Sequence, residues 1–196
     1  MGRRNATSAW EREEIIDKTA ADAPGEGGLA PGMIDSCGDF GIRIARDGTW
    51  FYHDSPIRRL PLVKLFASVL RREADGGYWL VTPAERGRIE VEDAPFVAVE
   101  LEASGQDKDQ SLTFRTNLDD KVVAGESHPL RVATDPATGE PRPYILVKPG
   151  LEALLLRSVF YHLIERGHEA TIDGEPQFGV WSSGKFFPLG NLTDAT

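Results

Sequence analysis

Apolar and polar positions alternate through most of the chain after residue 36, and this pattern predicts many short strands. In CGDFGIRIARDGTWFY (37–52), alternating segments flank Asp47-Gly48. An Asp-Gly pair between such segments indicates a β-hairpin, because its tight turn needs a positive φ that Gly adopts freely. We therefore predict a hairpin over 37–52 with its turn at Asp47-Gly48.

Two further segments have the apolar spacing of a helix with one buried face. The first covers 61–72, with Pro61 in its first turn and Arg71 and Arg72 in its last turn, where cations favour the helix dipole. The second covers 151–164, where leucines and other apolar residues form a wide stripe. We predict one helix for each segment.

The remaining alternating segments are interpreted as strands separated by turn residues. They are YWLVT (78–82), GRIEVE (87–92), FVAVELE (96–102), LTFRT (112–116), KVVA (121–124), LRVAT (130–134), YILVK (144–148), EATID (169–173) and the hairpin FGVWSSGKFFPL (178–189). The last hairpin resembles the first, which suggests an internal duplication. The fold class predicted is α+β, with two small lobes of antiparallel strands and one main helix in each.

The chain divides into three predicted regions. Residues 1–35 combine a short amphipathic helix with ADAPGEGGLAPG (21–32), which has the composition of a flexible linker. Residues 36–104 form the first α+β domain and residues 105–196 the second. We place their boundary in the polar stretch between Ser104 and Gln110.

Charge and cysteine content narrow the classes of partner. The formal net charge is −9 and the sequence has no long basic run, so we expect no nucleic-acid binding. A single cysteine excludes an intrachain disulfide framework and favours a cytoplasmic location. No apolar run is long enough to span a membrane, so we expect no membrane association.

Motifs for catalysis or cofactor binding are weak. Cys37 and His53 lie at the two ends of the first hairpin, but a lone cysteine without a surrounding signature is more often a small buried residue. The four histidines lack metal-ligand spacing, and no phosphate-binding loop is present. We expect no catalytic residue, no metal and no cofactor.

Basic residues precede both predicted helices. Arg58 and Arg59 come before the first helix, and Arg142 and Lys148 come before the second. Because a helix start offers free N–H groups and a positive dipole end, cations beside it favour an anion. We therefore expect a small acidic ligand, although pairing with the 31 acidic residues also explains these cations.

Several motifs in this order resemble a known bacterial family. They are CGDFGIRIARDGTWFY, SPIRRLPLVKLFASVLRRE, YWLVTPAE, VEDAPFVAVE, FRTNLDD and HPLRV. With these motifs, residues 37–189 resemble the domain of unknown function 1285 family. The resemblance implies a two-domain α+β fold with repeated motifs and a role in signal transduction, and it carries over no catalytic residue.

The polar residues of these family motifs, together with the two arginines before the first helix, are the candidate ligand-binding residues. They are Asp39, Arg43, Asp47, Trp50, Arg58, Arg59, Thr82, Glu85, Arg115, Asn117, Asp120 and Trp181. Turns, cross-strand pairs and ion pairs between the domains also account for many of them.

The function predicted is that of a non-enzymatic ligand-binding or signal-transduction protein. Two alternatives stay open: a small hydrolase or isomerase that uses acidic residues in a cleft between the domains, and a protein-interaction module that acts through the N-terminal segment and a dimer surface. A homodimer is a further expectation. An enzyme needs clustered titratable groups with shifted pKa values, a ligand-binding protein a cavity with arginines or aromatic rings, and an interaction module an exposed apolar patch.

Overall fold

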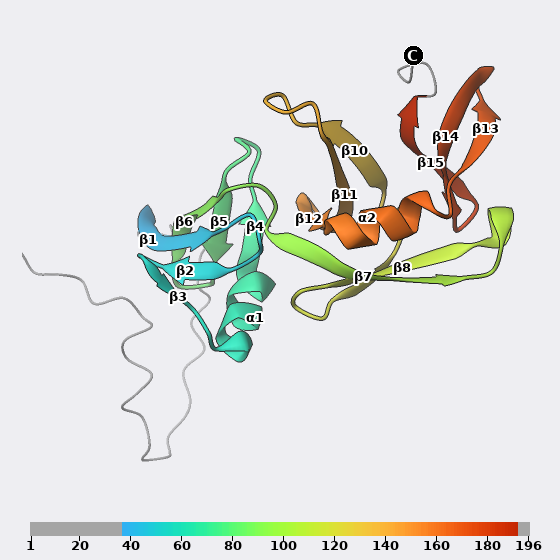
Figure 1. The fold of residues 1–196 in the computed structure, drawn as a ribbon. Helices are drawn as coiled ribbons and strands as arrows, with labels where there is room; N and C mark the ends of the chain where they lie inside the picture. The colour runs from blue at the N-terminus through green and yellow to red at the C-terminus, as the bar shows by residue number, and fades with distance from the viewer. Residues whose placement is uncertain (1–36, 192–196) are drawn as a thin grey trace, which may run out of the picture. The chain divides into compact units, whose positions relative to one another are not determined.

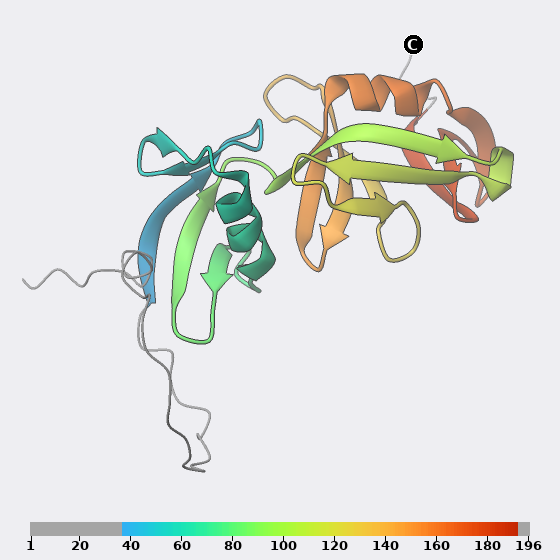
Figure 2. The same ribbon diagram turned by 90° about the horizontal axis from the view of Figure 1, so that it is seen from below.

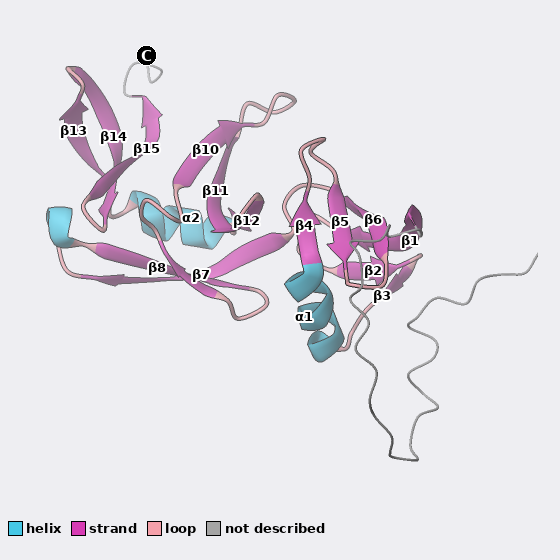
Figure 3. Ribbon diagram, turned by 180° about the vertical axis from the view of Figure 1, so that it is seen from behind, coloured by secondary structure: helices cyan, strands magenta, loops and turns pink. Residues whose placement is uncertain are grey.

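The computed structural model describes residues 37–191, and strands predominate in this part of the chain (Figure 1). Its elements in chain order are β1 (Cys37–Ile44), β2 (Trp50–Tyr52), β3 (Ser55–Pro56), α1 (Leu60–Val69), β4 (Leu70–Arg72), β5 (Tyr78–Val81), β6 (Arg86–Val91), β7 (Phe96–Ser104), the 3-10 helix η3 (Asp107–Asp109), β8 (Ser111–Thr116), β9 (Lys121–Val123), β10 (Leu130–Thr134), β11 (Pro141–Lys148), β12 (Leu151–Leu155), α2 (Arg157–Ile164), β13 (His168–Ile172), β14 (Glu175–Ser182) and β15 (Lys185–Asn191). The predicted α+β class is confirmed in part, because helices and strands are both present but strands predominate (Figure 3).

The strands of residues 37–191 form three sheets. The first has the order β3-β2-β1-β6-β5-β4, the second β10-β11-β12-β7-β8-β9 and the third β13-β14-β15. Most pairs are antiparallel, but β1 pairs with β6 and β12 pairs with β7 in parallel. The prediction of purely antiparallel lobes was therefore wrong at these two pairs.

Each of the six-stranded sheets is packed against one helix. Helix α1 contacts β5 of the first sheet, and α2 contacts β7 of the second sheet and β14 of the third (Figure 2). The core of the first sheet includes Ile44, Trp50 and Leu80, and that of the second includes Phe96 and Phe114, all of which are almost fully buried. These apolar side chains supply the main driving force for folding.

The predicted first hairpin is confirmed. Strands β1 and β2 are antiparallel, with Ile44 opposite Trp50. The turn spans 45–49 and is closed by a hydrogen bond from the Ala45 N–H to the Thr49 carbonyl. Gly48 has the positive φ of 82° that the Asp-Gly motif predicts.

The first predicted helix ends earlier than its apolar pattern indicated. Leu70 leaves the helical conformation, with φ −68° and ψ 136°, and residues 70–72 form β4. Arg71 and Arg72 therefore pair with β5, opposite Trp79 and Tyr78, and do not lie in a last helical turn. The buried Leu70 begins a strand because the turn after β4 folds the chain back onto β5.

The second predicted helix was wrong over its first five residues. Residues 151–155 form β12, which lies between β11 and the parallel strand β7. Every second residue, Leu151, Ala153 and Leu155, is buried, which is the period of a strand. The apolar Leu154 between them obscured this period in the sequence. Gly150, with φ 72°, forms the turn that returns the chain along β11.

Two other predictions remain as they were. The internal duplication stays a prediction, because the first hairpin belongs to a six-stranded sheet and the last one to a three-stranded sheet. The N-terminal helix and linker over 1–35 lie outside the described residues.

Within 37–191, no helix is long and apolar enough to cross a membrane.

A buried hydroxyl links the third sheet to the second. Ser182 on β14 is fully buried, and its Oγ accepts a hydrogen bond from the Leu112 N–H at 3.0 Å. The same hydroxyl donates to the Ala124 carbonyl at 2.7 Å. Nearby, the Gln110 amide donates to the Trp181 carbonyl, so both sheets are joined by side-chain to backbone bonds.

We predict that Ser182→Ala lowers the free energy of unfolding by about 1–3 kcal/mol, because it leaves the buried Leu112 N–H without an acceptor. The neighbouring Ser183→Ala is the matched control. It removes a second donor to the same Ala124 carbonyl but leaves Ser182 in place, so a smaller loss is expected. Urea denaturation followed by circular dichroism measures both; equal losses would contradict the assignment.

Candidate functional site

A cavity of about 480 Å³ lies between α2 and the facing parts of β11 and β12. We call it the α2 cavity. It is lined by Glu140, Pro141, Arg142, Pro143, Leu154, Leu155, Arg157, Phe160, Tyr161 and Ile164. Its volume falls in the range of cavities that bind small organic molecules.

The inner wall of the α2 cavity is apolar. Pro143, Leu155 and Phe160 are buried, while Tyr161 on α2 keeps 54% of its surface exposed. An exposed aromatic ring beside buried apolar residues offers a flat surface for an apolar part of a ligand. The chain reaches this arrangement because β12 ends directly before α2 begins, which brings strand and helix residues to one cavity.

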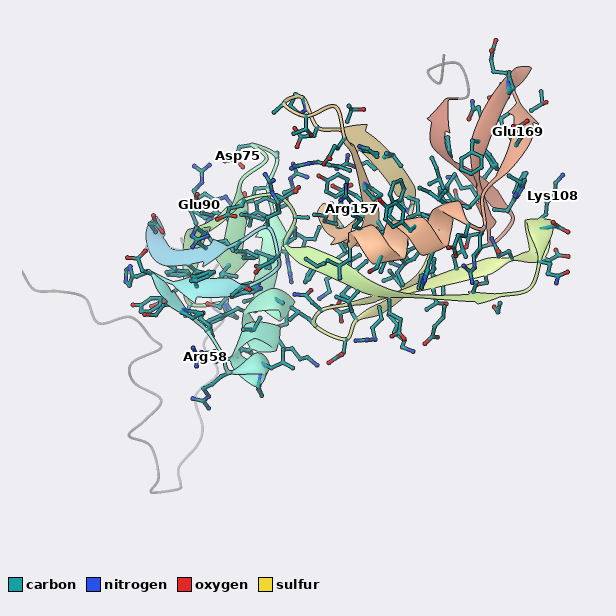
Figure 4. All side chains as sticks on the ribbon, viewed as in Figure 1. Arg58, Asp75, Glu90, Lys108, Arg157 and Glu169 are labelled. Carbon is teal, nitrogen blue, oxygen red and sulfur yellow. The ribbon has the colours of Figure 1, made fainter. Side chains whose placement is uncertain are left out.

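Charged groups stand at the rim. Arg157 is the first residue of α2, labelled in Figure 4, and its side chain is 74% exposed. Its Nη2 lies 3.6 Å from a carboxylate oxygen of Glu140, which also lines the cavity. An ion pair this exposed contributes little stability, so a competing anion can replace Glu140 at low energetic cost.

The second arginine, Arg142, is held by acids. Its guanidinium donates to Asp93 at 3.1 Å and lies 2.8 Å from Asp135. The Asp93 side chain is only 6% exposed and also accepts a hydrogen bond of 2.7 Å from the Tyr144 hydroxyl. Burial, followed by this bond to Asp93, raises the pKa of Tyr144, so the phenol stays protonated and remains a donor.

The residues predicted from FRTNLDD mainly stabilise their own loop and its neighbours. Arg115 pairs with Glu100 at 2.6 Å and with Asp119, and the hydrogen bond from Arg115 to Glu100 raises the pKa of the guanidinium. Asn117 accepts from the Val97 N–H and donates to the Gly48 carbonyl. Asp120 pairs with Lys148 at 3.3 Å. None of these three candidates lines the α2 cavity.

The candidates from the first hairpin also have structural partners. Asp47 accepts a hydrogen bond from the Thr49 N–H, which lowers the pKa of its carboxyl group. Arg43 contacts Glu92 and stacks over the Phe51 ring. Trp50 is 2% exposed and belongs to the core. Asp39 accepts from the Gly41 N–H and lines a second cavity in the first sheet.

The remaining candidates are spread over the described residues. Thr82 and Glu85 close the turn between β5 and β6 through hydrogen bonds. Trp181 contacts Phe186 at 5.4 Å and carries Lys108 over its ring. Arg58 and Arg59, at the start of α1, are exposed and have no ion pair or hydrogen bond to another described side chain. The twelve candidates are thus not brought together in one site.

Sequence reasoning missed the residues that line the α2 cavity, apart from Arg142. Arg157 and Tyr161 lie on the polar side of an apolar helical stripe, where such residues are usually only solvated. The sequence signal that could have found Arg157 is a basic residue at the start of a helix. It was missed because the helix was predicted to begin at residue 151. Among the described residues, no cluster of three or more His, Cys, Asp or Glu could hold a metal ion.

The fold and the cavities define a strand-rich α+β protein made of a sheet-and-helix unit up to residue 94 and a second unit beyond it. Two family models match in the same order, the "Domain of unknown function (DUF1285), N-terminal domain" over 33–94 and the "Protein of unknown function (DUF1285), C-terminal domain" over 95–189. The chain belongs to this family. The models meet before β7, whereas the sequence patterns placed the boundary after it.

A similar solved structure agrees with this membership. The crystal structure of a DUF1285 family protein from Silicibacter pomeroyi DSS-3 has a TM-score of 0.75 and 48% sequence identity, covering 86% of this chain and 92% of that chain. One from Shewanella baltica OS155 has a TM-score of 0.49 and 25% identity, covering 64% of this chain and 91% of that chain. No curated protein matches the sequence.

Proposed function

We propose that this is a non-enzymatic ligand-binding protein that takes a small organic anion with an apolar body into the α2 cavity, and that it serves signal transduction. The observation that carries the proposal is the composition of the cavity, in which two arginines stand beside a wall of aromatic and aliphatic side chains. Cavities that combine mostly apolar walls with a few charged groups are the usual binding sites for small molecules.

The charge of the proposed ligand follows from Arg157 and Glu140. The Glu140 carboxylate lies beside the Arg157 guanidinium at 3.6 Å. A ligand carboxylate or phosphate that enters the cavity can take the same place and gain two parallel hydrogen bonds from the guanidinium. Glu140 is 65% exposed in its side chain and can turn to solvent when it is displaced.

The apolar body follows from the aromatic residues. Phe160 and Tyr161 are consecutive residues of α2, and both line the cavity together with Pro143 from β11. Aromatic and aliphatic groups of a ligand gain free energy in proportion to the apolar surface that they bury against such a wall. An aromatic or branched carboxylic acid meets both requirements.

Arg142 supports the signalling part of the proposal. It lines the cavity and also donates to Asp93, two residues before the second family model begins. An anion that draws Arg142 toward the cavity weakens its bond to the almost fully buried Asp93, which then keeps only the Tyr144 hydroxyl and a longer contact of 3.8 Å with Arg46. Because an unpaired buried charge is costly, the segment around Asp93 is expected to adjust when the cavity is occupied.

The alternatives have less support. The acidic residues of the α2 cavity and its rim, Glu140 and Asp135, are paired with arginines, which favours a structural role over acid–base chemistry. A hydrolase or isomerase between the domains, an interaction module and a homodimer therefore stay predictions.

The test is a thermal-shift titration of the full chain with benzoate, phenylacetate, phenylpropionate and phenyl phosphate. A ligand at one hundred times its Kd stabilises a protein by about 2.7 kcal/mol, which is readily measured. We expect at least one of these anions to raise the Tm, and Arg157→Ala to weaken its binding by about tenfold or more.

Arg166→Ala is the matched control, because Arg166 follows the same helix, is exposed and does not line the cavity. Its binding is expected to equal that of the wild-type protein. Tyr161→Ala should weaken the aromatic acids more than acetate, which has no apolar body to lose. The proposal fails if no anion of the panel shifts the Tm, or if Arg157→Ala and Arg166→Ala bind equally well.

A further inference from the structure

A second cavity, of about 340 Å³, lies in the first sheet beside β6, and we call it the β6 cavity. It is lined by Asp39 from β1, by Arg88 and Glu90 from β6, and by Tyr78 and Gly77 at the start of β5. The parallel ladder of β1 and β6 is interrupted here, because its register shifts between Asp39 and Arg43. The interruption and the turn before β5 leave space in the sheet surface.

The charged groups of this cavity have few partners of their own. Within 37–191, the side chains of Arg88 and Glu90 form no ion pair and no hydrogen bond, although both are exposed and charged. Asp39 accepts one hydrogen bond, from the Gly41 N–H, which leaves its other oxygen available. Asp39 and Arg88 are also register partners across the ladder, yet they form no ion pair with each other.

Two other arginines of the same sheet, Arg86 and Arg43, do have acidic partners. Arg86, two residues before Arg88, pairs with Glu73 at 3.1 Å and stacks over the Trp79 ring. Arg43 contacts Glu92 and stacks over Phe51. Arg88 has no acidic partner, although two carboxylates line the same cavity and the chain has more acidic than basic residues. We interpret these three charges as groups that are available to bind a ligand.

The signs of these charges define the ligand. A simple anion would be attracted by Arg88 but repelled by Asp39 and Glu90. A simple cation would be attracted by the two acids but repelled by Arg88. A molecule with one carboxylate and one ammonium group satisfies all three, with its carboxylate on Arg88 and its ammonium group between the two acids.

From this arrangement we propose that the β6 cavity binds a free α-amino acid. The volume suits an amino acid of ordinary size. The glycines at positions 76 and 77 add no side chain on the side of the turn, so the ligand side chain can extend there into solvent. This site is separate from the α2 cavity and does not depend on the anion proposed there.

The test uses the full chain and isothermal titration with a panel of L-α-amino acids. The matched probes are the N-acetyl derivative, which lacks the ammonium group, and the amide, which lacks the carboxylate. We expect at least one amino acid to bind, and both derivatives to bind about tenfold or more weakly, because each loses one charged contact.

Variants locate the site. Arg88→Gln and Glu90→Gln should each weaken the amino acid about tenfold or more, and both residues are exposed, so the fold is expected to persist. Arg58→Gln is the matched control, since Arg58 is another exposed arginine of this unit that lies at the start of α1, away from Glu90 in Figure 4. Arg157→Ala should leave amino-acid binding unchanged, which separates this site from the α2 cavity.

Three results would overturn the proposal. They are the absence of binding by every amino acid of the panel, equal binding of an amino acid and its N-acetyl derivative, and wild-type affinity in both Arg88→Gln and Glu90→Gln. Binding that is lost in Arg157→Ala but kept in Arg88→Gln would assign the amino acid to the α2 cavity and contradict the β6 site.

Discussion

Trp50→Ala is expected to lower the free energy of unfolding by about 3–5 kcal/mol, the usual cost of removing a large aromatic side chain from a core. Trp50 is 2% exposed and its ring stacks on Phe66 of α1 at 6.2 Å. The substitution therefore leaves a cavity between β2 and the helix that packs on this sheet. For a chain of this length, the Tm is expected to fall by roughly 6–20 °C in thermal denaturation followed by circular dichroism.

Trp50→Phe provides the control for this prediction. The indole Nε1 of Trp50 is buried and has no hydrogen-bond partner among the described residues, which costs the wild-type protein free energy. Phenylalanine keeps most of the ring and removes that unpaired donor, so its loss of stability should be much smaller than that of alanine. Equal Tm values for the two variants would show that the ring does not fill the core.

Gly179→Val is expected to destabilise the third sheet by about 3 kcal/mol, the upper end of the cost of overpacking. Gly179 lies on β14 at the register shift between β14 and β15. A Cβ at this position would overlap the Phe187 carbonyl oxygen and lie 2.6 Å from the Phe186 ring. Backbone atoms of a paired strand cannot move aside as a flexible side chain can, so the two strands must separate.

The matched control is Gly190→Val, on β15 of the same sheet. A Cβ at Gly190 meets no atom within 4 Å, and this exposed residue has no positive φ. We expect the free energy of unfolding of this variant to stay within about 0.5 kcal/mol of the wild-type value. Hydrogen exchange of β13 to β15 measures the local effect; unchanged protection in Gly179→Val would contradict the predicted overlap.

The local patterns predicted strands and the first hairpin well, because alternation of apolar residues and an Asp-Gly turn act over a few residues. The patterns gave the wrong element where the spacing of apolar residues fitted both a helix and a strand. LEALL (151–155) has leucines at both helical and alternating positions, and only its pairing with β11 and β7 decides for a strand. Such pairing joins residues far apart in the chain, which local periodicity does not record.

The candidate site was harder to predict for a related reason. Polar residues in family motifs such as Asn117 and Thr82 mainly bond to loop backbone, and the sequence does not distinguish this role from ligand binding. Arg157 became a cavity residue only because β12 and α2 meet at its position. Of the twelve candidate ligand-binding residues, Asp39 alone lines a described cavity, and what distinguishes it is a register shift in the sheet.

The order of pairing in the sheets also has a consequence for how the protein folds during its synthesis. All strands of the first sheet come from residues 37–91, so this unit can complete its pairing as soon as β6 has left the ribosome. The second unit has to wait, because its first strand β7 needs β12, and the Leu112 N–H finds its acceptor only when Ser182 has been made. The N-terminal unit is thus expected to fold first, while the apolar strands of the second stay exposed longer and carry the greater risk of aggregation.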